Sequence, residues 1–106
     1  MTVRIQAFVV TCVFLCLPVL AHSSGLSEIR KAAQQGNAGA QGNLGLMYRE
    51  GQGVLQNYIQ AHKWLNLAAA GGNSYARAAR GAVEQMMTRD QIAKAQTLAQ
   101  EWEPER

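Results

Sequence analysis

Residues 38–73 read AGAQGNLGLMYREGQGVLQNYIQAHKWLNLAAAGGN, and this stretch contains the strongest indication of the fold. A pattern recurs here at a spacing of 36 positions, in the pairs Ala32 and Ala68, Ala33 and Ala69, Gly36 and Gly72, Asn37 and Asn73, Ala40 and Ala76, and Gly45 and Gly81. A repeat of about 20 to 50 residues is typical of stacked units, none of which can bury its apolar face alone. We therefore predict a short helical solenoid whose function depends on a binding surface rather than on a buried reaction centre.

The repeat divides into two helices joined by a loop. Leu44 and Tyr48 in its first half, and Trp64 and Ala68 in its second half, follow the spacing of an apolar helix face. Residues 51–56 between them are too polar and too rich in glycine to continue a helix. We expect one complete helix-turn-helix unit.

Asparagine and glycine mark the ends of the predicted helices. Asn37 and Asn57 stand just before the two helices, where a side-chain oxygen can accept a hydrogen bond from a free backbone N–H. Gly36 suits the left-handed conformation that ends a helix, so residues 26–35 are predicted to form an earlier helix. Because the same Gly-Asn pair recurs one period later, we expect two copies of one turn.

Residues 74–103 are predicted to form a hairpin that caps the stack. Its first helix is expected over residues 74–87, and its second helix starts at the capping box formed by Thr88 and Gln91. The inward-facing residues of the first helix are predicted to be Ala76, Ala79, Val83 and Met86. End repeats generally need a more polar outer face than internal ones.

Small residues are predicted to let the helices approach closely. Gly45 and Gly81 are expected where the two helices of a unit come nearest, because glycine leaves no side chain between the backbones. Gly39 and Gly42 each cost roughly 1 kcal/mol of helix stability relative to alanine, so we expect helix 38–50 to be the softest.

Twelve residues within the repeat form an ordered motif. They are Ala40, Leu44, Gly45, Tyr48, Gly51, Gly53, Tyr58, Ala61, Trp64, Ala68, Ala69 and Gly72. This motif resembles the Sel1-like repeat, a relative of the tetratricopeptide repeat. The resemblance implies an all-α fold, a short right-handed α-solenoid, with a partial repeat at residues 26–37, a full repeat at 38–73 and the capping hairpin at 74–103.

Residues 1–21 are predicted to be a signal peptide. Arg4 is followed by an apolar run that is shorter than the roughly 20 residues needed to span a bilayer. We expect cleavage after Ala21, with Ser23 as a second site and an uncleaved membrane anchor as the alternative. Residues 22–25 would then be a short flexible N-terminus, and the protein would be periplasmic or secreted, with membrane contact only through an uncleaved leader.

The remaining composition offers little for catalysis. Both cysteines, Cys12 and Cys16, lie in the predicted leader, and the chain has one aspartate, Asp90, and two histidines. His62 is predicted to be a partly exposed helical residue, although a cleaved chain beginning at His22 could bind copper with a second imidazole. We predict no enzyme activity, cofactor or metal, and the scattered charges, net +3, indicate no nucleic-acid partner.

Four residues are predicted to lie on a surface that binds another protein or peptide. They are Gln41, Asn43, Tyr75 and Arg77, at first-helix positions that would not point at the second helix. The resemblance implies an exported, non-catalytic adaptor or scaffold. The alternative is a minor envelope hydrolase or a peptidoglycan- or β-lactam-interacting protein, and self-association through the 26–35 helix also remains open.

Overall fold

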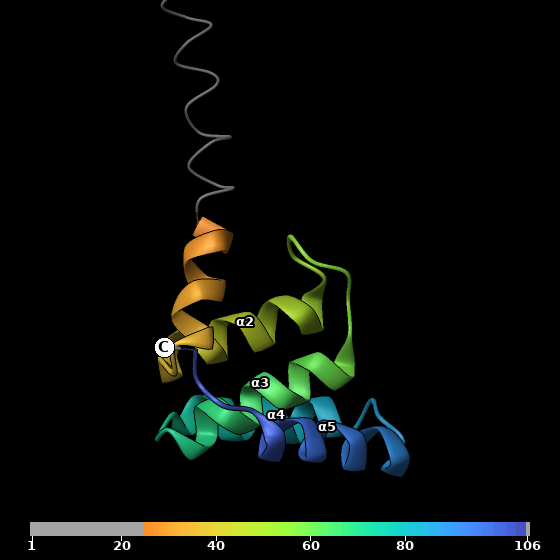
Figure 1. The fold of residues 1–106 in the computed structure, drawn as a ribbon. Coiled ribbons are helices and arrows are strands. Elements are labelled where there is room, and N and C mark those ends of the chain that lie inside the picture. The colour runs from red at the N-terminus through yellow and green to blue at the C-terminus, as the bar shows by residue number, and fades with distance from the viewer. Residues whose placement is uncertain (1–24, 106) are drawn as a thin grey trace, which may run out of the picture.

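The computed structural model describes residues 25–105, which contain five helices and no strand (Figure 1). Residues 25–34 form the first helix, and α2 (Ala38–Glu50), α3 (Tyr58–Ala70), α4 (Ser74–Glu84) and α5 (Arg89–Glu101) follow. The prediction of an all-α helical repeat fold is confirmed. The predicted leader, its cleavage sites and residues 22–24 lie outside the described residues. Within residues 25–105, no helix is both long and apolar enough to cross a membrane.

The helix ends form as the sequence predicts. The side chains of Asn37, Asn57 and Asn73 cap α2, α3 and α4, each accepting a hydrogen bond from the backbone N–H three residues later. Gly36 and Gly72 have φ angles of 100° and 98°, so the two Gly-Asn turns share one conformation. The capping box at the start of α5 is also present.

Helix α3 is the centre of the structure, because α2, α4 and α5 all pack against it. One apolar cluster joins Ala61, Leu65, Ala68 and Ala69 of α3 to Ala76, Ala79 and Val83 of α4. A second cluster joins Trp64 to Ala33 and Leu44. Trp64 is only 5% exposed, as expected for a residue that fills the space between helices.

The predicted role of glycine holds at Gly45 and is wrong at Gly81. A Cβ built on Gly45 would lie 2.7 Å from Leu65 Cγ and 3.1 Å from the Ala61 carbonyl oxygen, so the missing side chain allows α2 to approach α3. A Cβ built on Gly81 would meet nothing within 4 Å. Gly42 is a close-approach position instead, since its Cβ would lie 2.8 Å from Asn73 Nδ2.

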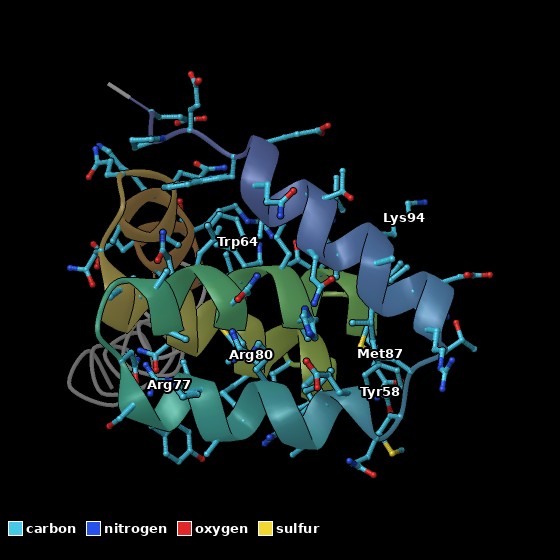
Figure 2. All side chains as sticks on the ribbon, turned by 90° about the horizontal axis from the view of Figure 1, so that it is seen from below. Tyr58, Trp64, Arg77, Arg80, Met87 and Lys94 are labelled. Carbon is cyan, nitrogen blue, oxygen red and sulfur yellow. The ribbon has the colours of Figure 1, made fainter. Side chains whose placement is uncertain are left out.

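The C-terminal part departs from the predicted hairpin. Helices α4 and α5 scarcely touch each other, and α3 lies between them (Figure 2). Helix α4 also ends at Glu84 rather than at residue 87, because the chain turns after Val83. Met86 is consequently 62% exposed rather than inward, and Met87 packs against the core in its place.

The segment after α5 returns to the first helix. Trp102 packs edge-on against Trp64 with ring centroids 6.1 Å apart, and the Glu105 N–H donates a hydrogen bond to the Gln34 carbonyl oxygen at 2.8 Å. Figure 1 shows this C-terminal segment beside the end of the helix over residues 25–34. The C-terminal segment therefore packs against the end of the first helix.

Candidate functional site

A polar seam joins α3 to α4, and we define it as His62, Asn66, Arg80 and Glu84. His62 Nε2 lies 2.8 Å from Glu84 Oε1, and Arg80 Nη1 donates a hydrogen bond to Asn66 Oδ1 at 2.6 Å. The two members on each helix are one turn apart, so the pairs form two successive rungs between antiparallel helices. The polar seam fixes the register of α4 on α3, because sliding either helix would separate both pairs.

The polar seam corrects the prediction that His62 is partly exposed. Its residue exposure is 0%, since the ring is covered where α4 packs on α3, and its Nδ1 finds no hydrogen-bond partner among the described residues. Glu84 is at the edge of the polar seam, with its side chain 36% exposed. A half-buried polar pair of this kind favours one packing arrangement at the cost of desolvating the buried group, here His62.

The same burial limits the chemistry available to His62. Asp90 lies in the exposed first turn of α5, and His22 is outside the described residues. Within residues 25–105, no three residues of the types His, Cys, Asp and Glu are grouped to hold a metal ion. The contacts of His62 are therefore those of a structural residue.

Lys63 lies beside the tryptophan pair. Its Nζ is 4.5 Å from the centroid of the Trp64 ring, a distance at which a cation is attracted by the aromatic face. Burial lowers the pKa of the Lys63 ammonium from its ordinary value, because the charged form loses hydration. The long side chain of Lys63 thus lies over the face of the Trp64 ring.

The structure separates the four predicted surface residues. The prediction that Gln41 is at the surface is wrong: Gln41 is 3% exposed, and its Nε2 donates a hydrogen bond to the Ala33 carbonyl oxygen at 3.2 Å. Asn43 is exposed on α2, and Tyr75 and Arg77 are exposed in the first turn of α4. Gln41 is inward because it reaches the helix that precedes the repeat, which the two-helix unit alone does not reveal.

Helix α4 also carries an exposed apolar face that was not predicted from the sequence. We call it the outer stripe, and it consists of Tyr75, Ala78, Ala82 and Met86. These exposed residues follow helical spacing through α4 and into the turn after it, and each stands one position before a core-facing residue. The sequence does carry a signal for this face, because apolar residues occur in adjacent pairs along α4 and only one member of each pair can face the core. The assignment of Met86 to the core hid this pattern.

The fold and these contacts define a helical repeat protein built from helix-turn-helix units. Comparison with protein families identifies the unit: residues 38–73 match the family described as the Sel1 repeat. The matched span covers α2, the following loop, α3 and the Asn73 cap, as the sequence motif predicts. A search of curated proteins gave no significant match. Sel1 repeats are protein-interaction modules.

Proposed function

We propose that this protein is a non-catalytic adaptor that binds another protein or a peptide through its first-helix surface. The observation that carries the proposal is the exposed pair Tyr75 and Arg77 at the start of α4. Tyrosine and arginine are among the residue types that most often anchor protein interfaces, because each combines a large contact area with hydrogen-bonding capacity.

The polar residues of the interior support a binding role over a catalytic one. His62 is enclosed and paired with Glu84, and Asn66 is paired with Arg80. These contacts join two helices and leave no nucleophile beside a base in the polar seam. The groups that remain free for recognition are therefore those on the outside of the helices.

Export is the second part of the proposal. The apolar run between Arg4 and Ala21 supports a cleavable leader and a periplasmic or secreted protein. Cell fractionation followed by N-terminal sequencing tests this directly. We expect the exported chain to begin at His22 or Ser24, and an intact chain in the membrane fraction would contradict cleavage.

The binding surface can be tested by crosslinking in envelope extract. The protein, purified after expression of the full sequence, is compared with a variant carrying Tyr75→Ala and Arg77→Ala. A control variant carries Leu55→Ala and Arg89→Ala, which remove an exposed apolar side chain and an exposed arginine away from α4. We expect a partner to be crosslinked by the parent and the control and lost with the α4 variant. If all three proteins crosslinked the same partner equally, Tyr75 and Arg77 would not form the binding surface.

A further inference from the structure

Helix α4 corresponds to the first helix of a repeat unit, but α5, which follows it as the second helix of that unit, does not pack on it. By the 36-residue period, α4 is the equivalent of α2, and Gly81 is the equivalent of Gly45. On α2, the Gly45 position takes Leu65 of α3. On α4, the Gly81 position is open, because α5 packs on α3 instead. The face that receives a helix in one copy of the repeat is therefore uncovered in the other.

This uncovered face has two different edges. Ala78 and Gly81 form its shallow centre, where another backbone can come close. The other members of the outer stripe form an apolar edge, and two of them, Tyr75 and Met86, are 64% and 62% exposed. Arg77 and Glu84 lie on the opposite side of the helix and form a charged edge; Glu84 contacts His62 through Oε1, and its side chain is still 36% exposed.

We propose that α4 forms an antiparallel dimer interface, on which a second copy of this chain lays its own α4. In a two-fold antiparallel pair, each edge of the helix meets the same edge of its partner. Arg77 then faces Glu84 of the second copy, and Tyr75 faces Met86 of the second copy. Ala78 faces Ala82 of the second copy, with Gly81 near the two-fold axis. In this register the charges of Arg77 and Glu84 are complementary, and the large side chains of Tyr75 and Met86 lie together on the apolar edge.

The pattern favours a second copy over another occupant. A parallel two-fold pair would place the charged edge of one helix, with Arg77, against the apolar edge of the other, which would desolvate the charges without pairing them. Among the described residues, the exposed large apolar side chains are Leu55, Tyr75 and Met86, so two of the three lie on α4 or in the turn directly after it. The core-facing apolar residues of α2 and α3 are already packed in the two clusters, so those helices of a second copy have no comparable face to offer.

The dimer is expected to be weak and reversible. One pair of short helices buries less than the roughly 1,200 Å² of a standard interface, which corresponds to the transient class. We expect a dissociation constant on the order of 100 μM. The interface includes Tyr75 and Arg77, so dimerisation would compete with the partner binding proposed above. The dimer itself does not depend on that proposal, because it involves this chain alone.

Sedimentation equilibrium of the protein purified after expression of residues 1–106 tests the dimer. Gly81→Leu places a branched side chain at the centre of the interface, and Gln96→Leu adds the same side chain to the exposed part of α5 as a control. We expect Gly81→Leu to raise the dissociation constant at least tenfold and Gln96→Leu to leave it unchanged. Circular dichroism melting confirms that both variants fold.

Register is tested separately by disulfide crosslinking. A chain carrying Ala78→Cys is mixed with a chain carrying Ala82→Cys, and the parent chain gives the background from Cys12 and Cys16. We expect the mixed disulfide to exceed either homodimer. A monomer at concentrations up to about 1 mM, ten times the expected constant, would overturn the dimer. So would a dimer unaffected by Gly81→Leu, or crosslinks that form only between identical residues. A folded monomer that still crosslinks its envelope partner would overturn the dimer alone and leave the proposed function standing.

Discussion

Replacing Gly45 and Gly81 separately by alanine should change stability in opposite directions. The two residues occupy equivalent positions in the repeat, and both lie within helices, so alanine brings the same gain in helix propensity, about 1 kcal/mol. Only their surroundings differ. This pair therefore isolates the effect of helix packing from the effect of the backbone.

At Gly45 the added Cβ must enter an occupied space. It would lie 2.7 Å from Leu65 Cγ, 2.9 Å from Leu65 Cδ2 and 3.1 Å from the Ala61 carbonyl oxygen. Leu65 is fully buried and the carbonyl belongs to the α3 backbone, so neither can move without displacing α3. Overpacking of this kind costs about 1–3 kcal/mol, and a contact this short belongs at the upper end. After subtracting the propensity gain, we expect Gly45→Ala to lower the free energy of unfolding by about 2 kcal/mol.

At Gly81 the added Cβ meets nothing within 4 Å. We expect Gly81→Ala to raise the free energy of unfolding by about 1 kcal/mol. Urea denaturation followed by circular dichroism measures both changes, at a protein concentration well below the proposed dimer constant so that self-association does not contribute. Stabilisation by both substitutions would show that α2 and α3 are not in close contact, and destabilisation by both would show that α4 is covered. Either result would refute the packing described above.

Three further predictions concern contacts elsewhere in the chain. Trp102→Ala removes the edge-on contact with Trp64 and should lower the free energy of unfolding by about 2 kcal/mol in a urea titration, whereas Trp102→Phe, which keeps an aromatic edge, should lose less. Asn73→Ala removes the α4 cap at a cost of about 1 kcal/mol, and Asn73→Asp should retain most of it; equal losses in thermal melts would exclude the cap. Burial lowers the Lys63 pKa below its ordinary value of 10.5, so the unfolded chain binds the proton more tightly than the folded one. Stability should therefore rise as pH increases from the folded pKa towards 10.5, and Lys63→Met should remove that rise, which urea titrations at several pH values would detect.

Local signals predicted most of the fold because they act over a few residues. Three asparagines, Asn37, Asn57 and Asn73, each cap a helix by accepting a hydrogen bond from the backbone N–H three residues later. Their position in the sequence is therefore sufficient to place a helix start. Gly36 and Gly72 ended helices for an equally local reason, since their φ angles are positive. These signals do not depend on where the next helix packs.

The errors arose where the arrangement of several helices decides the outcome. Gln41 is buried because the helix before the repeat supplies the Ala33 carbonyl, and His62 is buried because α4 supplies Glu84. Gly81 repeats Gly45 in the sequence, but its environment depends on the position of α5, which the repeat motif itself does not specify. The repeat thus predicted the local conformation of each unit. It could not predict which helix would pack against each face of that unit.

The position of α5 follows from the connection that precedes it and the residues that end it. Residues 85–88 join α4 to α5, a shorter connection than residues 51–57 between α2 and α3, so the two helix pairs cannot have the same geometry. Ala95 and Ala99 are buried on α5, and Trp102 reaches Trp64 at the far end. Helix α5 therefore closes the α3 side of the molecule and leaves α4 without a covering helix. If α5 packed on α4 instead, it would cover the outer stripe. Packing α5 on α3 therefore buries the Trp64–Trp102 contact and leaves the surface of α4 exposed for the proposed binding.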